Sequence, residues 1–557
     1  MTNHMIAADS GRRPPFLQTG MAVVGAFAGA IAVAGVAAMS VKVMGFAGPL
    51  MIIVGVAAVF AAIVMVLRPG IGVFALFTVA YICTGLSRYV PGPLGLSVDG
   101  VLVLLLTGVL LANWYRPEWR GIMSPSFVGI MLWTLLCVAQ LGNPNAASRV
   151  AWFFAVRGVA LYWLFGYPVF ALLLNPDKGA AYETVLWRRV KPGLAGQTPG
   201  VPVRAAAAPR AGTGGAARRI DGWQLVIWAT IFILSFSCAG ALWGLKQVTI
   251  GLDPFEYAWL QEPGNLSTHM LFGRLRVFSF FSDTGQFGIN MAYTSLMAVI
   301  LACGPWPKKV RIALWCAAAL LFIGLGKSGT RSAYIGFLAG FPVFFLLRRN
   351  IRIVIIGGLV IGSVVGVLKY THIGQGNYTI QRMRQAVNPM DDPSFLVRLE
   401  NQRRLADYLK SHPFGGGIGS AGYWGARFSP GTFLANLALD SWYVKIAAEQ
   451  GQVGLVLYVA FIIFLGVRGV MAGWRERDPA RRNLLEAYAS MYWGVALASY
   501  SNQYLGQIPT GIIMLFSVAL FEFALRQSVA GGIVDPVRRS LAHMRSSLPP
   551  ARSRPLK

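Results

Sequence analysis

Long apolar runs separated by short polar segments dominate the chain. A helix needs about 20 apolar residues to cross the hydrocarbon core of a bilayer, so runs of this length predict transmembrane helices. Several runs are shorter, and we expect fourteen spans, although twelve or thirteen would also fit the pattern. The runs cover residues 20–40, 46–67, 70–86, 95–113, 125–141, 151–174, 223–243, 284–303, 309–325, 331–347, 351–370, 441–467, 484–505 and 508–526.

Two polar segments are much longer than the other loops. Residues 175–222 are rich in Pro, Gly, Ala and Arg and have few large apolar side chains, so they are predicted to be a disordered cytoplasmic linker. Residues 371–440 are predicted to form one large periplasmic loop that contains short helices. Within it, apolar positions from 395 to 409 recur every three or four residues, which predicts an amphipathic helix on the membrane face.

The predicted fold is an all-α, polytopic integral membrane protein. Besides the linker, its parts are N-terminal transmembrane helices over residues 1–174, a membrane core with the periplasmic loop over 223–526 and a basic cytoplasmic tail over 527–557. A mean hydropathy of +0.57 excludes a soluble domain. Arg12 and Arg13 precede the first apolar run, which lacks a clear cleavage site and is therefore predicted to be a membrane helix rather than a removed signal peptide.

The formal net charge of +28 comes mainly from basic residues in short loops. Membrane orientation and anionic lipid explain this distribution better than nucleic acid does, so we expect no nucleic-acid partner. With both termini cytoplasmic, the short cytoplasmic loops hold the excess of Lys and Arg, as the positive-inside rule requires. Arginines in the outer loops run against this rule and therefore call for a function.

No metal site is predicted. The five cysteines lie in or at the edge of apolar runs, and neither a disulfide framework nor a metal-ligand spacing follows from them. Asp391 and Asp392 form an acidic pair in the predicted loop, but a pair without further oxygen ligands is a poor metal site. A solvated turn before Pro393 is the better interpretation.

The segment from Lys327 to Ser332 has the composition of an anion site. A helix is predicted to begin near Ser328 or Thr330, both good N-caps, so free backbone N–H groups and the positive end of the helix dipole would meet Lys327 and Arg331. Such a place suits a phosphate or pyrophosphate group. The alternative is that the two cations extend to the membrane interface and the hydroxyl groups only cap a helix.

A second pair of outer arginines, Arg274 and Arg276, lies in a Phe-rich segment that leads to Asp283. A second anion clamp is one interpretation of this pair. The alternative is an ion pair with Asp283 or Glu262 that only holds the loop.

The segment after His412 is rich in glycine, and Gly417, Gly419 and Gly422 match the dinucleotide fingerprint formally. The match is weak because no strand precedes it and the segment is predicted to lie outside the cell. The glycines are better explained by tight turns and by close approach of a ligand or lipid. His412 is a candidate general base, with a purely structural role as the alternative.

Two carboxylates mark the start of the twelfth predicted span. Asp440 either caps this helix or, among the arginines at the membrane surface, removes a proton from a sugar hydroxyl. Glu449 lies nine residues further, about 13.5 Å deeper along a helix, so the two cannot share one proton transfer. Carboxylates inside the membrane are often functional, and pairing with an arginine of a neighbouring helix is the alternative for Glu449.

These marks together resemble the O-antigen ligase and polymerase superfamily of bacterial inner-membrane glycosyltransferases. The resemblance covers roughly residues 223–526 and rests on Arg276–Gly288, Ser328–Ser332, His412–Gly415 and the spacing over Asp440–Gly454. In that last segment the ligases have a His, then Asn, Ser or Gln, nine variable residues and Gly-x-x-Gly. The present chain keeps every mark except the His, whose place Asp440 takes.

The resemblance implies many helices in the bacterial inner membrane, a large periplasmic loop, and transfer of a glycan from undecaprenyl diphosphate to a glycan or lipid acceptor. It also implies that no metal or cofactor is needed, since arginines hold the diphosphate. Carried over by position, Arg276, Arg331 and one of Arg382 or Arg384 would hold this leaving group, and Asp440 would act in the place of the ligase histidine.

We therefore expect an inverting, metal-independent glycosyltransferase of surface polysaccharide biosynthesis. Because the histidine is replaced, polymerisation of a repeat unit is as credible as ligation. A transporter or flippase of a lipid-linked glycan is the main alternative, but it would need charges in several spans and internal repeats. Apart from Arg157, Lys445 and Glu449, the spans are nearly free of charge. A scaffold protein without chemistry would have no use for the outer arginines.

Overall fold

The computed structural model describes residues 47–90, 92–114, 119–174, 222–271, 273–349, 351–374, 376, 378–388 and 393–546. The predicted span over 20–40, almost all of the predicted linker and the pair Asp391 and Asp392 lie outside these residues. The chain divides into two compact units, Met1–Met65 and Val66–Lys557. In the first unit the structure describes the start of the apolar helix α2 (Ala47–Leu67), and all that follows concerns the second unit.

Long apolar helices make up most of the second unit. They are α3 (Pro69–Leu86), α4 (Leu96–Trp114), α5 (Pro125–Ala139), α6 (Arg149–Val156) with the π turn η3 (Arg157–Leu161) and α7 (Tyr162–Leu174), α9 (Gly222–Thr249), α12 (Thr284–Ala302), α13 (Lys308–Ser328), α14 (Arg331–Arg348), α15 (Ile351–Tyr370), α20 (Trp442–Arg475), α21 (Pro479–Ala498) and α22 (Thr510–Ser546).

These helices confirm the predicted all-α, polytopic membrane class. Within the described residues, every predicted apolar run from 46–67 onward coincides with a helix, and eight helices are long and apolar enough to cross a membrane. Three further apolar helices are shorter, so the expected total of about fourteen spans stays a prediction. One predicted boundary is wrong: the run over 484–505 ends early, because α21 stops at Ala498 and a non-helical polar stretch follows.

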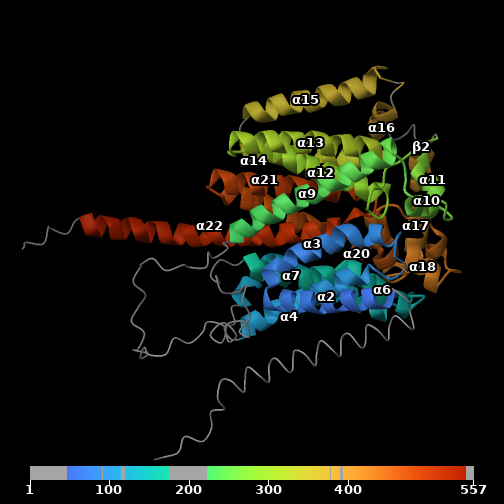
Figure 1. Cartoon of the computed structure of the whole chain (residues 1–557), viewed down its shortest axis with the longest axis horizontal. Helices are drawn as coiled ribbons and strands as arrows, with labels where there is room; N and C mark the ends of the chain where they lie inside the picture. The colour runs from blue at the N-terminus through green and yellow to red at the C-terminus, as the bar shows by residue number, and fades with distance from the viewer. Residues whose placement is uncertain are drawn as a thin grey trace, which may run out of the picture. The chain divides into compact units, whose positions relative to one another are not determined.

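Short elements gather at one end of the helical bundle, drawn at the right in Figure 1, which we call the loop end. They are α10 (Pro254–Leu260), α11 (Asn265–His269), the paired strands β1 (Met270–Leu271) and β2 (Arg274–Leu275), α16 (Tyr378–Val387), α17 (Pro393–Ser411), α18 (Gly422–Phe428) and α19 (Phe433–Asn436). The outer segments singled out in the sequence are therefore all at this end.

The predicted amphipathic helix is α17, but its apolar stripe does not all face lipid. Leu405 and Leu409 are buried in a small cluster with Leu434 of α19 and Ala448 of α20. Burial of this stripe against protein fixes the loop on the membrane bundle, since apolar area removed from water stabilises the contact.

Helix α12 is the centre of the bundle. All its residues except Val299 are buried, and it packs against α9, α13, α14 and α21. Small residues permit this packing: a Cβ at Gly288 would lie 2.7 Å from the Ser328 hydroxyl. The turn between α13 and α14 can therefore approach α12 closely at the loop end.

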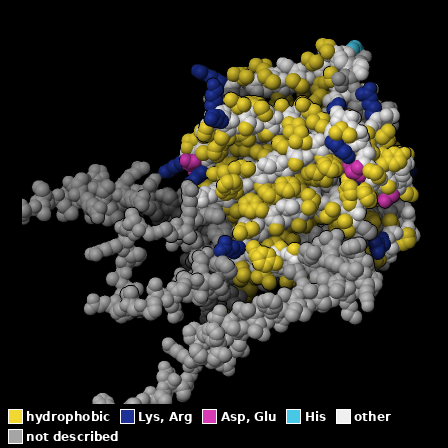
Figure 2. All heavy atoms as spheres, in the orientation of Figure 1, with side chains coloured by type: hydrophobic (Ala, Val, Ile, Leu, Met, Phe, Trp, Pro, Cys, Tyr) yellow, Lys and Arg dark blue, Asp and Glu magenta, His cyan; other side chains and the backbone are white. Residues whose placement is uncertain are grey.

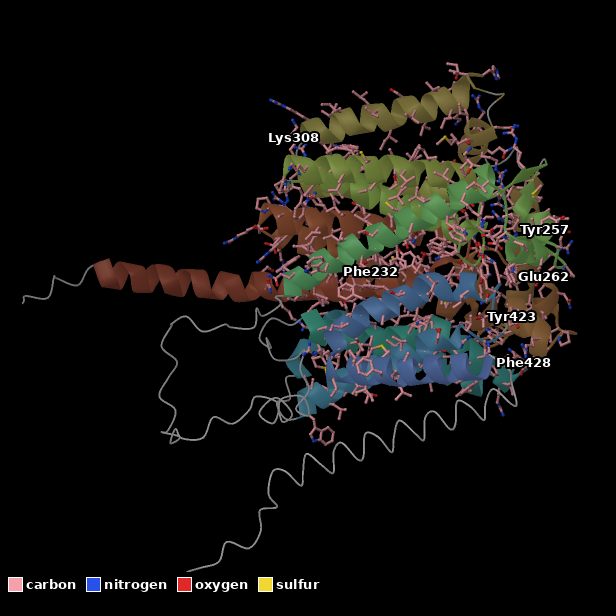
Figure 3. The ribbon with its side chains drawn as sticks, viewed as in Figure 1. Phe232, Tyr257, Glu262, Lys308, Tyr423 and Phe428 are labelled. Atoms are coloured by element: carbon pink, nitrogen blue, oxygen red, sulfur yellow. The ribbon has the colours of Figure 1, made fainter. Side chains whose placement is uncertain are left out.

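The surface agrees with a membrane position. Figure 2 shows a broad belt of hydrophobic side chains, with Lys and Arg side chains toward both ends of the bundle. Tyr257, Glu262, Tyr423 and Phe428 lie at the loop end, whereas Lys308, which begins α13, lies at the opposite end (Figure 3). Each end of the belt thus carries the polar side chains expected at a membrane–water boundary.

Candidate functional site

The turn between α13 and α14 is the first part of the site. Gly329 ends α13 in the left-handed conformation, with φ 59°, and Thr330 occupies the N-cap position of α14. The Thr330 side chain makes no capping bond; its hydroxyl donates 2.9 Å to the carbonyl oxygen of Thr284 on α12. The Ser328 hydroxyl accepts 3.1 Å from the Thr330 N–H. The two predicted hydroxyl residues therefore bind the turn to the central helix.

Arg276, which directly follows the strand β2, reaches this turn. Its Nε donates 3.2 Å to the carbonyl oxygen of Ser328, and its Nη2 donates 3.1 Å to the Thr330 hydroxyl. Its Nη1 donates 2.8 Å to the carbonyl oxygen of Thr268. Neither Asp283 nor Glu262 forms a salt bridge in the described part of the chain, so carbonyl groups rather than a carboxylate hold this loop.

Arg382 reaches the same turn from α16 of the long loop. The side chain is 7% exposed, and its Nε and Nη2 each donate 3.0 Å to the carbonyl oxygen of Gly329. The carbonyl groups at the end of α13 carry partial negative charge, which Arg276 and Arg382 offset. Since Arg331 is the first residue of α14, three arginines from distant segments meet at one turn.

The other two predicted arginines lie apart from the turn's carbonyl groups. Arg384 donates to the carbonyl oxygens of Thr371 and, at 3.0 Å, of Ile373, so it fixes the connection between α15 and α16. Arg274 is exposed and, with Lys327, lines a cavity of about 440 Å³. Thr379 of α16 also lines the cavity, which therefore lies between the end of α13, β2 and α16.

Asp283 begins the central helix α12. Its Oδ1 accepts 2.7 Å from the N–H of Gly285 and 2.9 Å from that of Gln286, and its Oδ2 accepts 2.8 Å from the Ser282 hydroxyl. This is an N-cap, which satisfies helix N–H groups and favours a negative charge there. The Gln507 amide approaches the same carboxylate at 3.5 Å.

Asp440 precedes α20 but does not cap it, which excludes the capping alternative for this residue. The N-cap is Ser441, whose hydroxyl accepts 3.3 Å from the N–H of Val444. Asp440 instead accepts a 2.7 Å hydrogen bond at Oδ2 from Nε of Arg398 on α17, and its side chain is half exposed. Within the described residues, Oδ1 accepts no hydrogen bond.

His412, the other candidate base, is bound locally. Its Nδ1 lies 2.9 Å from the Ser411 hydroxyl and 3.1 Å from the carbonyl oxygen of Tyr408, and its ring stacks on Tyr408 with centroids 4.1 Å apart. No hydrogen bond joins it to Asp440 in the described part of the chain. These contacts favour the structural alternative.

The glycine-rich turn after His412 packs against a break in α20. Gly415 has φ 71°, and the N–H of Gly416 donates 2.9 Å to the carbonyl oxygen of Ala448. Opposite it, Gly451 interrupts α20 with φ 74° and ψ −174°. The glycines thus permit tight turns and close approach, as predicted, although the approaching group is the backbone of α20.

Glu449 is wholly buried beside this break. In the described residues its carboxylate oxygens have no hydrogen-bond partner of normal geometry, and the ion pair with an arginine, which was the alternative for this residue, is not formed.

A segment that the sequence did not single out, residues 499–509 between α21 and α22, joins these parts. Because its flanks are apolar, the segment was assigned to two predicted spans. The polar run from Ser499 to Gln503 is the feature of the sequence that could have identified it. Two of its contacts are with the start of α20: Gln503 donates to the Leu439 carbonyl oxygen, and the Ser499 carbonyl oxygen accepts 3.1 Å from the Trp442 N–H. Two others are with the arginine turn and the central helix. The hydroxyls of Tyr504 and Ser332 are 2.6 Å apart, and Gln507 approaches Asp283.

Arg88 was also missed, because it lies in a short loop after α3. Its guanidinium donates 2.7 Å to the carbonyl oxygen of Ser279 and also binds that of Phe281, which fixes the segment before Asp283. Burial lowers the pKa of Arg88 to about 10, and nearby carboxylates, first Glu256, act in the opposite direction. The group therefore stays cationic at neutral pH.

Among the described residues, no group of three or more His, Cys, Asp or Glu side chains is placed to hold a metal ion. Fold and site together define a polytopic membrane protein with an arginine-rich turn and a separate exposed carboxylate at one end of its bundle.

Residues 316–459 match the family model of the O-antigen ligases. This segment runs from α13 through the arginine turn and the long loop into α20, and it contains Arg331, Arg382 and Asp440. No match was found among the curated proteins. The match over this segment confirms the resemblance to the ligase and polymerase superfamily.

This family supports a role in surface polysaccharide biosynthesis and an activity like that of a glycosyltransferase. It also implies a lipid-linked glycan and an acceptor as substrates.

Proposed function

We propose that the protein transfers or polymerises a glycan from undecaprenyl diphosphate to an acceptor hydroxyl at the periplasmic face of the bacterial inner membrane. The observation that carries this proposal is the meeting of Arg276, Arg331 and Arg382 at the turn between α13 and α14, within the segment that matches the O-antigen ligases. The turn lies at the end of a membrane bundle, where the headgroup of a lipid-linked donor would also lie.

The donor diphosphate would occupy the cavity of about 440 Å³ beside this turn. Arg274 and Lys327 line the cavity, and Arg331 stands at the N-terminus of the 18-residue helix α14. Arginine matches phosphate oxygens with two parallel N–H groups, and a helix N-terminus adds partial positive charge. Arg276 and Arg382 would position the turn, because their donor groups are bound to its carbonyl oxygens and hydroxyl.

The proposed reaction is a single displacement with inversion. The acceptor hydroxyl oxygen forms a bond to the anomeric carbon of the donor, the bond from that carbon to the diphosphate oxygen breaks, and the hydroxyl proton passes to Oδ1 of Asp440. Undecaprenyl diphosphate leaves with the bonding electron pair. Fixed cations stabilise the charge that grows on this leaving group, and they do so without a metal or cofactor.

The distribution of charge supports the proposed membrane orientation. Lys308 lies at the end of the bundle opposite the loop end (Figure 3). Two further helices, α14 and α20, end at the basic residues Arg348 and Arg475. Basic residues in short loops face the cytoplasm, so we place the loop end in the periplasm and both termini in the cytoplasm.

Ligation and polymerisation use the same chemistry and differ in the acceptor. A deletion strain distinguishes them by its lipid-linked intermediates: single repeat units left on lipid indicate a lost polymerase, and long chains left on lipid indicate a lost ligase. A flippase would change translocation without changing glycan chain length.

The proposal is tested with Arg331→Ala in cells whose membranes contain normal amounts of the inserted protein. Surface polysaccharide should disappear, whereas the matched variant Arg403→Ala, an exposed position on α17, should retain it. Unchanged polysaccharide in Arg331→Ala would contradict the assignment.

A further inference from the structure

A second cavity, of about 250 Å³, lies at the loop end and belongs to none of the roles assigned above. Its walls come from α6, the π turn η3, α18, the first turns of α20 and the segment 499–509. The side chains that decide its chemistry are Arg157, Tyr162, Trp424, Trp442, Lys445 and Gln507.

Two of these side chains are cations inside an otherwise apolar bundle. Arg157 is paired with Asp99 of α4 at 2.9 Å, and it begins the π turn, a local distortion that often occurs at functional sites. Lys445 forms no salt bridge in the described part of the chain, and its ammonium lies 5.5 Å from the centroid of the Trp442 ring. The cavity therefore has one cation that is not held in a salt bridge.

The aromatic side chains that line the cavity are fixed in place. Trp424 stacks with Phe154 of α6, the ring centroids being 5.1 Å apart, so α18 is held over α6. The Trp442 ring lies so close to Gly506 that a Cβ there would overlap it. The Trp442 Nε1 donates 2.7 Å to the Tyr458 hydroxyl, which sets the ring's orientation. Contacts with neighbouring residues therefore hold both tryptophan rings in place at the cavity wall.

The cavity lies close to the parts of the proposed reaction. Ser282 and Gln507 line it, and both reach the carboxylate of Asp283, which begins the central helix behind the arginine turn. Lys445 is one turn inside α20, whose N-cap Ser441 directly follows Asp440. The cavity and the proposed base therefore share the first turns of α20, although Asp440 itself lines a separate cavity with Arg398.

We propose that this cavity binds an acidic sugar residue of the acceptor glycan, with the sugar carboxylate at Lys445 and Arg157 and its apolar ring face on the tryptophan wall. Aromatic walls with a few fixed polar groups are typical of small-ligand pockets. A phosphate group would use the cations but not the rings, and a neutral sugar would use the rings but not the unpaired cation. The inference rests on the proposed function, since it names the acceptor of that reaction.

The experiment measures binding of three probes to the full-length protein in nanodiscs: cellobiuronic acid, neutral cellobiose and inorganic phosphate. The acidic disaccharide should bind about tenfold more tightly than cellobiose, which is the effect of one additional charge-assisted contact. Lys445→Met, which keeps an apolar stem of similar length, should reduce this preference to about one. Lys410→Met on the exposed surface of α17 is the matched control and should keep the preference.

Trp424→Ala should weaken binding of both disaccharides to a similar extent. Equal binding of the two disaccharides by the wild-type protein would overturn the inference, as would displacement of cellobiuronic acid by phosphate at similar concentrations. Binding is measured without turnover, so the acceptor assignment and the proposed function are tested independently of each other. Selective binding in a protein that transfers no glycan would contradict only the proposed function, and transfer without selectivity would contradict only the acceptor assignment.

Discussion

Arg382 donates two hydrogen bonds of 3.0 Å, from Nε and Nη2, to the single carbonyl oxygen of Gly329. The carbonyl belongs to the end of α13, and the arginine belongs to α16 of the long loop. One buried side chain therefore attaches the loop to the membrane bundle at the point where the other arginines meet.

Replacing Arg382 by lysine should detach α16 although the charge is kept. A lysine ammonium is a point charge on a flexible stem and cannot reproduce the planar pair of donors, and a hydrogen bond to a charged group contributes about 1.5–3 kcal/mol. We expect faster hydrogen exchange over residues 378–388 and about tenfold lower transfer. Arg403→Ala is the control, since that side chain is exposed. Wild-type exchange in Arg382→Lys would contradict this role.

Gly451→Ala should destabilise the whole loop end. A Cβ at Gly451 would overlap the carbonyl oxygen of Pro413, and φ 74° with ψ −174° is a conformation that costs other residues about 1–3 kcal/mol. Thermal unfolding in detergent should therefore shift to lower temperature. Gly362→Ala on α15 is the matched control, because a Cβ there meets no atom within 4 Å. Equal melting temperatures for the two variants would be inconsistent with a closely packed break.

The helices were predictable from the sequence because bilayer thickness sets the length of an apolar run. The gathering of Arg276, Arg331 and Arg382 at one end followed from the same count of spans. The groups that bind two of these arginines could not be predicted. They are the backbone carbonyl oxygens of Ser328 and Gly329, and every residue has such a group, so the sequence does not distinguish them.

Two other features depend on contacts between distant segments. The pair of Asp440 and Arg398 joins residues 42 positions apart, so only the docking of α17 on α20 creates it. The cavity at Arg157 is closed by residues 506–508, which the pattern of apolar residues had placed at the boundary of two spans. Hydropathy identifies the segments that cross the membrane. It does not identify a short polar segment between two spans, such as residues 499–509, that packs against the site.

Acid should destabilise the protein partly through His269. Its ring is buried between Trp259 and Phe278, and its Nε2 has no hydrogen-bond partner in the described residues. Burial lowers the pKa of His269 in the folded state, and the hydrogen bond to Asn265 only partly offsets this effect. Because the unfolded chain takes up the proton first, near pH 6.5, stability should fall as the pH drops from there to the folded pKa and change no further below it.

Melting temperatures between pH 7.5 and pH 5 check this expectation. His269→Gln, which cannot be protonated, should show a smaller loss than the wild-type protein over that interval. An identical loss in both proteins would assign the acid sensitivity to other groups.

Asp440→Asn should nearly abolish glycan transfer while leaving the fold intact. The amide keeps the shape of the side chain but cannot accept the hydroxyl proton, and loss of a general base costs about 10²–10⁴ in rate. Arg398→Ala removes the partner at 2.7 Å but keeps the carboxylate, so transfer should fall much less. Since both side chains of the pair are partly exposed to solvent, the pair contributes little to stability and both variants should melt near the wild-type temperature. Transfer rates measured in membrane vesicles compare these two variants with the wild-type protein and with His412→Gln. Loss of activity in His412→Gln but not in Asp440→Asn would contradict the proposal and assign the role of general base to His412.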